Sequence, residues 1–292
     1  MSSVKNLLLL TRPNNCVKNL IIFSPVFFSG QFHNLFFLKQ SFFAFFSFSF
    51  ITSSIYILND YMDLSSDRRH PLKKERILAS GKVTTNEAKI MFFILLITGL
   101  SLTYSITTVS TFYVSLFYVV IMIVYCIEFR KWALIDVSII SIGFVLRLYI
   151  GSTATGIQNS MWIIIMTFLL AIFITFAKRR DDLLNHNKSG ENSIRESLNG
   201  YSLGMINTMI NILVPIIIVS YLLYCTSEEN MTRVGNNLFL TSVFVLFGFI
   251  RYLQLIFVKN LGGDPIKLLF NDFGIQLMLL CWLLSFGWIL YP

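Results

Sequence analysis

Three aspartates, Asp60, Asp63 and Asp67, follow one another at spacings of three and four residues, directly after a long apolar run. If helical geometry continues through this segment, their carboxylates share one stripe of the helix with His70. Carboxylates on one stripe repel one another, and only a multiply charged cation or full solvation is expected to offset that repulsion. Oxygen ligands at this density suit Mg²⁺, which takes one or two carboxylates, several waters and the phosphates of a substrate. We therefore predict a Mg²⁺ site formed by Asn59, Asp60, Asp63 and Asp67.

Basic residues follow the acids closely: Lys73, Lys74, Arg76 and Lys82. A simpler interpretation is a solvated helix end whose acids balance Arg68 and Arg69. The acids begin, however, at the edge of an apolar run long enough to cross a membrane, and they stand beside a cluster of cations. This combination favours a joint metal and phosphate site. A metal alone would not require the cations, whereas a polyphosphate substrate would.

The elements that must position these residues are membrane helices. The chain has 292 residues, of which 55% are apolar and 13% charged, and its mean hydropathy is +0.70; soluble domains carry roughly a quarter charged residues. Runs that are apolar on every side exclude β-barrel strands, which alternate. We predict an all-α integral membrane protein, a single domain over residues 1–292 with about nine transmembrane helices. The runs are centred on residues 14–30, 41–58, 88–106, 111–128, 135–153, 161–178, 203–224, 238–257 and 273–291.

The formal net charge of +8 lies mostly on one side of this bundle. Cations open the first apolar run and gather after the second, fourth, sixth and eighth runs, while the opposite side holds only Lys39 and Arg233. By the positive-inside rule, the amino terminus and the long loops 59–87 and 179–201 are cytoplasmic. The positive charge is thereby explained by the membrane, and no nucleic-acid partner is expected. Four scattered cysteines indicate neither a disulfide framework nor a zinc site.

The acidic segment as a whole resembles a known signature. Asn59-Asp60-x-x-Asp63-x-x-x-Asp67 is followed by His70-Pro71-x-Lys73-x-x-Arg76 and then by Ala79-Ser80-Gly81. This pattern is similar to the first signature of the UbiA-type intramembrane prenyltransferase superfamily. Within the superfamily it most resembles the decaprenyl-phosphate (polyprenyl-phosphate) phosphoribosyltransferases. The resemblance implies a bundle of nine helices around a central cavity that opens to the lipid and is capped on the cytoplasmic side.

Further matches extend along most of the chain. Arg12-Pro13, followed by Val17-Lys18-Asn19, resembles the opening motif of the family, with Cys16 in the place of the usual tryptophan. Leu146-Arg147 resembles the intramembrane arginine of the fifth helix, and Lys178-Arg179 resembles the start of the second cytoplasmic loop.

The second loop also departs from the superfamily. Aromatic and lipid prenyltransferases carry a second acidic motif there, which holds a second metal on a prenyl diphosphate. Here Asp181 and Asp182 are adjacent, so on a helix they point about 100° apart and cannot form a pair on one face. A basic loop at this place suits a second phosphate group better than a second metal, although ordinary positive-inside charge would also explain Lys178 and Arg179.

The resemblance implies transfer of a 5-phosphoribosyl group from phosphoribosyl diphosphate to a polyprenyl phosphate, in the synthesis of a lipid-linked sugar precursor for the cell envelope. Asp60, Asp63 and Asp67 would be catalytic, holding Mg²⁺ on the diphosphate of the donor. Arg147 would meet the acceptor or, alternatively, pair structurally with Asp136 or Asp272. The implied substrate-binding residues are Arg12, Lys18, Asn19, His70, Lys73, Arg76, Arg147, Lys178 and Arg179. We assign Lys73, Arg76, Lys178 and Arg179 to the donor, and Arg12, Lys18 or Arg147 to the phosphate of the acceptor.

Two other functions fit parts of the pattern. The first is a UbiA-type transfer of a prenyl group from its diphosphate to an aromatic or lipid acceptor, against which the missing second acidic motif argues. The second is a cation transporter, against which the clustering of the acids at one helix end argues. We expect the protein in the inner, plasma membrane of a bacterium, with its active site and amino terminus on the cytoplasmic side.

Overall fold

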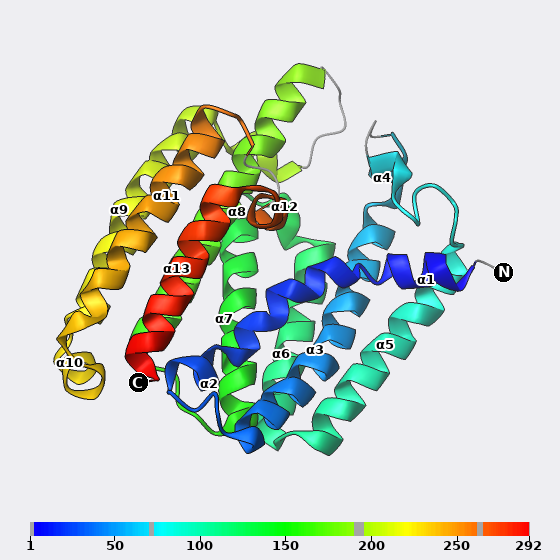
Figure 1. Ribbon diagram of the computed structural model, residues 1–292. Coiled ribbons are helices and arrows are strands. Elements are labelled where there is room, and N and C mark those ends of the chain that lie inside the picture. Colours follow the sequence, from blue (N-terminus) through cyan, green and yellow to red (C-terminus); the bar gives the residue numbers. More distant parts are fainter. Residues whose placement is uncertain (1–2, 70–72, 190–195, 262–264, 292) are drawn as a thin grey trace. The chain divides into compact units, whose positions relative to one another are not determined.

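The computed structural model describes residues 3–69, 73–189, 196–261 and 265–291. Every regular element in these ranges is a helix (Figure 1). The chain forms two compact units, residues 1–159 and 160–292. The predicted all-α architecture is confirmed, and the single domain over 1–292 stays a prediction.

The first unit carries the acidic segment. Its elements are α1 (Val4–Leu10), η1 (Pro13–Phe23), α2 (Ser24–Phe28), α3 (Leu35–Met62), α4 (Leu64–Arg69), η2 (Lys73–Glu75), α5 (Thr85–Ile106), α6 (Val109–Ile127), η3 (Phe129–Lys131) and α7 (Ile135–Thr155). The η elements are 3₁₀ helices. The long helix α3 is central, because α5, α6, α7 and η1 all pack against it (Figure 1).

The elements of the second unit are α8 (Met161–Ser189), η4 (Glu196–Gly200), α9 (Leu203–Cys225), α10 (Glu228–Val234), η5 (Asn236–Thr241), α11 (Ser242–Phe257), α12 (Pro265–Asn271) and α13 (Phe273–Leu290). Helix α8 extends to Ser189, so residues 179–189 of the predicted loop 179–201 are helical. Helix α9 packs against α8 and α11, and α11 packs against α13.

Eight helices within the described residues are long and apolar enough to cross a membrane. They match the second to the ninth of the predicted runs. The first predicted run, 14–30, is instead divided into η1 and α2, with Pro13 at the start of η1 and Pro25 in α2. A 3₁₀ helix rises about 2.0 Å per residue, so η1 and α2 end to end measure about 29 Å, close to the roughly 30 Å of a bilayer core. The division therefore changes the kind of helix in the first run, while its total length still matches the thickness of a bilayer core.

Two glycines in the first unit allow helices to pack backbone to backbone. A Cβ at Gly99 of α5 would lie 2.9 Å from the carbonyl oxygen of Ser47 in α3. A Cβ at Gly151 of α7 would lie 2.0 Å from the carbonyl oxygen of Ile22 in η1. Only glycine permits these approaches without a shift of the backbone. They hold α5 and η1 close to the central part of the unit.

A small apolar cluster then brings the charged segments together. Leu10 of α1, Ile57 of α3 and Leu78 of the loop before α5 are all buried in one cluster. Arg12, Asp60 and Arg76 lie only two or three residues from these anchors along the chain. The packing of the anchors therefore places the three charged side chains next to one another. Helix α5 begins directly after this loop, at a capping box between Thr84 and Glu87.

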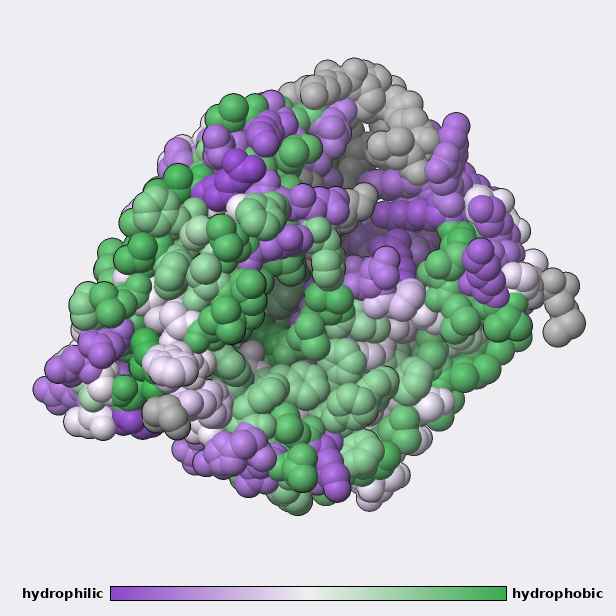
Figure 2. All heavy atoms as spheres, viewed as in Figure 1, coloured by the Kyte–Doolittle hydropathy of each residue, from purple (hydrophilic) through white to green (hydrophobic). Residues whose placement is uncertain are grey.

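The surface of the first unit separates by polarity. Figure 2 shows a broad hydrophobic area over its middle, and hydrophilic atoms gathered around α4. Large apolar side chains on α3 and α5 are exposed, among them Phe42, Phe46, Ile90 and Ile97. Exposed apolar surface of this kind belongs in contact with lipid, which is consistent with an integral membrane protein.

Candidate active site

The three aspartates do not form one uninterrupted stripe. Helix α3 ends at Met62, Asp63 forms a turn with φ −90° and ψ −1°, and α4 begins at Leu64. The side chains of Asp60 and Asp67 are 5% exposed, whereas that of Asp63 is 29% exposed. The break at Asp63 thus separates the acids into a buried pair and a more exposed single residue, where continuous helical geometry would have aligned them.

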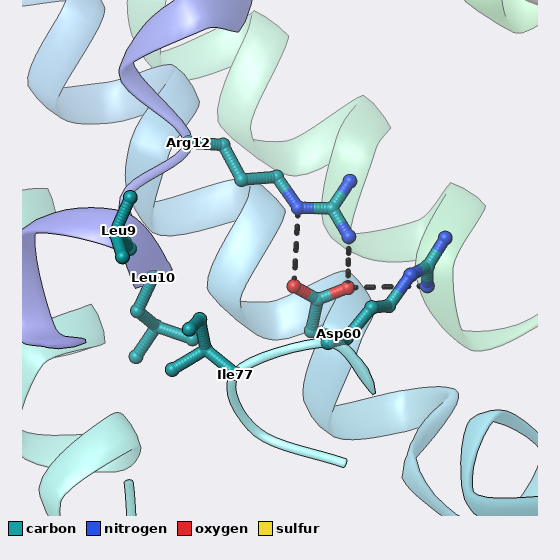
Figure 3. A pocket seen from close by; sticks show the side chains of 6 residues that line it. Leu9, Leu10, Arg12, Asp60 and Ile77 are labelled. Carbon is teal, nitrogen blue, oxygen red and sulfur yellow. Dashed lines mark hydrogen bonds and ion pairs between the residues drawn. The ribbon is translucent and has the colours of Figure 1, made fainter. Parts of the chain in front are cut away.

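Two arginines hold the buried pair, and Figure 3 shows the contacts at Asp60. Arg12 donates from Nε to Oδ2 of Asp60 at 3.1 Å and from Nη2 to Oδ1 of the same carboxylate. Arg76 donates from one nitrogen, Nη1, to Oδ2 of Asp67 at 2.6 Å and to Oδ1 of Asp60 at 3.3 Å. The guanidinium group of Arg76 therefore bridges the two carboxylates. Such bidentate and bridging contacts are the geometry in which arginine binds carboxylates and phosphates most strongly.

Arg12 adopts an unusual backbone conformation. Its φ of 52° and ψ of 59° lie in the left-handed region, which costs a residue other than glycine on the order of 1–3 kcal/mol. The paired contact with Asp60 holds the side chain in place despite this cost. Strain of this kind gathers at ligand-binding sites, which makes Arg12 a candidate for a functional role.

Asp63 is engaged separately. Arg130 of η3 donates from Nη1 to its Oδ1, and Asn59 donates from Nδ2 to its Oδ2 at 3.1 Å. Arg130 was not among the predicted site residues, and it lies 67 residues from Asp63 along the chain. Its only sequence signal was a position among the cations of the predicted cytoplasmic side. The tertiary fold brings Arg130 into contact with Asp63.

The repulsion among the acids is thus offset in a way that the sequence analysis did not expect. Arg12, Arg76 and Arg130 supply counter-charges, so neither a bound metal nor full solvation is required for the acids to coexist. Across the described residues, no three side chains of aspartate, glutamate, histidine or cysteine converge as ligands of one ion. Asp60 and Asp67 nevertheless both reach the same cationic nitrogen of Arg76. Two carboxylates that converge on one positive centre are a donor set that fits Mg²⁺.

A pocket with a volume of about 270 Å³ adjoins Asp60 and its two arginines. Figure 3 shows how Arg12 and Asp60 meet beside the apolar side chains of Leu9, Leu10 and Ile77. Its lining residues are Leu9, Leu10, Arg12, Asp60, Arg76 and Ile77. The pocket therefore combines a charged wall with an apolar one.

Asn19 and Arg147 form a third group, deeper in the first unit. Both are buried, and Nε of Arg147 donates to Oδ1 of Asn19 at 2.9 Å. Arg147 also donates to the carbonyl oxygen of Gly143 at 2.6 Å and to the hydroxyl of Tyr118 at 3.0 Å. These three hydrogen bonds go to neutral groups, and the guanidinium also lies over the rings of Phe48, Tyr118 and Phe144 at 5.1–5.6 Å from their centroids.

The structural pairing of Arg147 with an acid is not observed among the described residues. Asp272 instead accepts hydrogen bonds from Arg251, and Asp136 accepts one from the backbone N–H of Val137. A buried cation that is held by neutral groups keeps its charge available to a nearby anion. The role of Arg147 in binding the phosphate of the acceptor therefore stays a prediction.

The basic residues of the second unit were predicted to clamp the donor. Lys178 is exposed, whereas Arg179 is fully buried and donates from Nη1 to Oδ2 of Asp182 at 2.9 Å. Asp181 accepts a hydrogen bond from Asn185 at 3.0 Å. The two adjacent acids thus point to different partners, and neither forms a carboxylate pair with the other.

Two further predicted residues lie near the acids in the sequence. Lys73 is exposed in η2. His70 lies outside the described residues. The structure therefore brings together Arg12, Asp60, Asp67 and Arg76 as one cluster, Asn59 and Asp63 as a second, and Asn19 and Arg147 as a third.

Relatives with known names share nearly the whole chain. A decaprenyl-phosphate phosphoribosyltransferase from Corynebacterium glutamicum is 27% identical over 277 residues, which are 93% of this chain and 82% of the relative. A decaprenyl-phosphate phosphoribosyltransferase from Mycobacterium tuberculosis is 25% identical over 280 residues, which are 94% of this chain and 91% of the relative. These similarities confirm the resemblance that the acidic segment indicated.

The fold has a counterpart of known structure. A UbiA homolog from Archaeoglobus fulgidus, solved with GPP and Mg²⁺ bound, matches with a TM-score of 0.71 at 18% identity, over 98% of this chain and 99% of that one. At this identity the match shows the fold. The model of the UbiA prenyltransferase family matches residues 21–273. The chain belongs to the UbiA prenyltransferase family, and it is an integral membrane transferase of that family.

Proposed function

We propose that the protein transfers a 5-phosphoribosyl group from phosphoribosyl diphosphate to a polyprenyl phosphate, with release of diphosphate, in a reaction that depends on Mg²⁺. The observation that carries the proposal is the cluster of Asp60, Asp67, Arg12 and Arg76. It joins carboxylates that suit a divalent cation to guanidinium groups that suit phosphates. The names and coverage of the phosphoribosyltransferase relatives support the same substrates.

Asn59, Asp60, Asp63 and Asp67 would hold Mg²⁺ on the diphosphate of the donor. The ion supplies neutralisation of the charge that develops on the departing diphosphate. Arg76, which already lies between Asp60 and Asp67, would move from a carboxylate to a phosphate oxygen of the donor. Arginine binds both groups with the same fork geometry, so this exchange needs no change in the kind of contact.

An oxygen of the acceptor phosphate would attack C1 of the ribose as the bond between C1 and the diphosphate oxygen breaks. A phosphate monoester is already anionic near neutral pH, since its second pKa is about 6. The acceptor therefore needs no strong general base. Positioning of the two substrates would supply most of the acceleration.

The distribution of charge supports a cytoplasmic active site in a bacterial plasma membrane. The acidic cluster lies at the end of α3, beside the basic loop that the positive-inside rule assigns to the cytoplasm. A positive face there would attract the polyanionic, water-soluble donor. The lipid acceptor would arrive from within the membrane, as expected of an enzyme that builds a lipid-linked precursor for the cell envelope.

The contacts of the second unit support this reaction over prenyl transfer. Asp181 and Asp182 are engaged by Asn185 and Arg179 and do not form a second carboxylate pair. Transfer from a prenyl diphosphate with two metals would call for such a pair. Lys178, which is exposed on α8, would instead suit a phosphate group, whereas Arg179 is fully buried and held by Asp182.

The test is incubation of purified protein with labelled phosphoribosyl diphosphate, Mg²⁺ and a polyprenyl phosphate, followed by organic extraction. We expect label in a lipid that survives mild base and releases ribose phosphate in mild acid. Folded protein that yields no labelled lipid would overturn the proposal. Formation of a prenylated aromatic product from a polyprenyl diphosphate would establish the alternative transfer instead.

Replacement of Asp63, the most exposed of the three aspartates in the acidic segment, tests its place in the site. We expect Asp63→Asn to abolish turnover while the thermal unfolding temperature stays close to that of the wild type, because the Asp63 side chain is already 29% exposed. Glu128→Gln is the matched control. Among the described residues this carboxylate pairs with Lys131 at the surface, at 3.2 Å, and its loss should leave activity unchanged. Full activity in Asp63→Asn would remove Asp63 from the site.

A further inference from the structure

Tyr56 lies on α3 one helical turn before Asp60, and its ring is shared by two cations. Cζ of Arg12 lies 5.9 Å from the centroid of the ring, and Nζ of Lys18 lies 5.8 Å from it. A cation at this distance is attracted to the electron-rich face of an aromatic ring. The ring therefore brings Arg12 and Lys18 to one point.

The hydroxyl of Tyr56 differs from two other tyrosine hydroxyls inside the helical units. That of Tyr118 accepts a hydrogen bond from Arg147, and that of Tyr221 bonds with Thr241 and Trp282. Within the described part of the chain, the hydroxyl of the half-buried Tyr56 has no hydrogen-bond partner. Its environment is positive, because the charges of Arg12 and Arg147 both act on it.

A phenol hydroxyl in a positive environment can help neighbouring cations to bind an anion. It donates one directed hydrogen bond to an anion, and the cations stabilise the charge of that anion. The members of this group are Tyr56, Arg12, Lys18 and Arg147, and all of them belong to the first unit. We call Tyr56, Arg12 and Lys18 the Tyr56 subsite.

We propose that the Tyr56 subsite binds the phosphate of the lipid acceptor, with a hydrogen bond from the Tyr56 hydroxyl. This inference rests on the proposed function, and it assigns a binding site to the lipid acceptor. Tyr56 lies about 6 Å further into the membrane-spanning part of α3 than Asp60, since four residues of α-helix rise that far. A phosphate that is tethered to hydrocarbon approaches from this side, whereas the soluble donor meets Asp60 and Arg76 at the helix end.

Arg12 connects the two places. It contacts the carboxylate of Asp60 and the ring of Tyr56 at once. The phosphate of the acceptor at the Tyr56 subsite would therefore lie directly beside the donor at the acids. That arrangement brings the attacking oxygen close to the ribose that it must reach.

The direct test measures binding without turnover, with farnesyl phosphate as the probe. Titration calorimetry in detergent would compare the wild type with Tyr56→Phe, which keeps the ring and its two cations but lacks the hydroxyl. We expect the affinity for farnesyl phosphate to fall roughly tenfold, the usual loss for a hydrogen bond to a charged group. The affinity for phosphoribosyl diphosphate should stay unchanged. Tyr56→Leu, which also removes the ring, should lose more.

A second tyrosine of the same helix provides the matched control. Nζ of Lys89 lies 5.1 Å from the ring centroid of Tyr61, so Tyr61→Phe also removes a hydroxyl from a ring that carries a cation. This variant should bind farnesyl phosphate as the wild type does. In turnover assays, Tyr56→Phe should raise KM for the lipid with little change in kcat, a separation that general destabilisation would not produce.

The outcomes separate this inference from the proposed function. Unchanged binding of farnesyl phosphate by Tyr56→Phe would overturn the Tyr56 subsite even if the wild type labels lipid. An equal loss of affinity for farnesol, which has no phosphate, would overturn it as well. If the wild type labels no lipid but Tyr56→Phe specifically loses farnesyl phosphate, the subsite stands and the phosphoribosyl transfer fails.

Discussion

Arg76 occupies the place between Asp60 and Asp67 that a divalent cation would take, so the two should compete. Removal of the guanidinium in Arg76→Gln leaves Asp60 with Arg12 as its partner. It leaves Asp67 without its 2.6 Å contact, in a site where the carboxylate side chain is 5% exposed. We expect the variant to be less stable without metal and to bind a divalent cation more tightly than the wild type.

The size of the effect follows from burial. Loss of one partner of a buried ion pair costs about 3–5 kcal/mol, whereas exposed pairs contribute about 0–1 kcal/mol. The side chain of Arg76 is 29% exposed while those of both acids are 5% exposed, so the pair lies between these limits. We expect the free energy of unfolding to fall by about 2 kcal/mol. The same amount, recovered when an ion replaces the guanidinium, corresponds to about 30-fold tighter binding.

The assay combines two measurements on protein in detergent. Electron paramagnetic resonance of Mn²⁺ would report the affinity of the free protein for a divalent cation, and thermal unfolding with and without Mg²⁺ would report stability. Lys74→Gln is the matched control, because this exposed lysine lies in the same loop and also loses one positive charge. If Arg76→Gln unfolds at the wild-type temperature and binds Mn²⁺ no more tightly than Lys74→Gln does, the competition between Arg76 and a cation is refuted.

The remaining predictions concern the two units separately. Gly151→Ala should unfold the protein at a clearly lower temperature, by a loss of more than about 2 kcal/mol, because its Cβ would lie 2.0 Å from the carbonyl oxygen of Ile22; Gly287→Ala, with no atom within 4 Å of the added Cβ, should be neutral in the same thermal assay. In the second unit, hydrogen bonds from Arg251 hold the pKa of Asp272 below its ordinary range, so the ionised carboxylate stabilises the fold above about pH 3.9 and loses this effect as the pH falls through its lowered pKa. Asp272→Asn should therefore lower the unfolding temperature at neutral pH, and its difference from the wild type should shrink in acid; a difference that is constant with pH would contradict the reasoning.

The membrane helices and the acidic motif could be predicted from the sequence because both depend on local patterns. In lipid, each helix satisfies its own backbone hydrogen bonds, so an apolar run of sufficient length is nearly enough to predict a membrane-spanning helix. The first predicted run is the exception. The run 14–30 instead forms η1 and α2, with prolines at positions 13 and 25, and η1 packs against α7. A choice between 3₁₀ and α geometry at such a place is not encoded by apolar length alone.

The stripe of aspartates shows where local pattern stops being sufficient. A turn at Asp63 divides the acids, and the sequence carries no clear sign of it. Arg130 illustrates the same point, since nothing in the sequence around it distinguishes it from the other basic residues that follow apolar runs. The residue types of the acidic segment could thus be predicted from the sequence, whereas the arginine partners of its carboxylates could not.

The sequence by itself determined that this chain crosses a membrane as a bundle of helices, and that aspartates and basic residues follow its second apolar run. Only the tertiary structure decided which charges meet: Arg12 with Asp60 across 48 residues, Arg130 with Asp63 across 67, and Arg147 with Asn19 across 128. Helix formation depends on neighbours along the chain, whereas these contacts depend on close approaches such as that of Gly151 to Ile22. The positions of several helices must be set together before such a contact can form, and no local spacing encodes that.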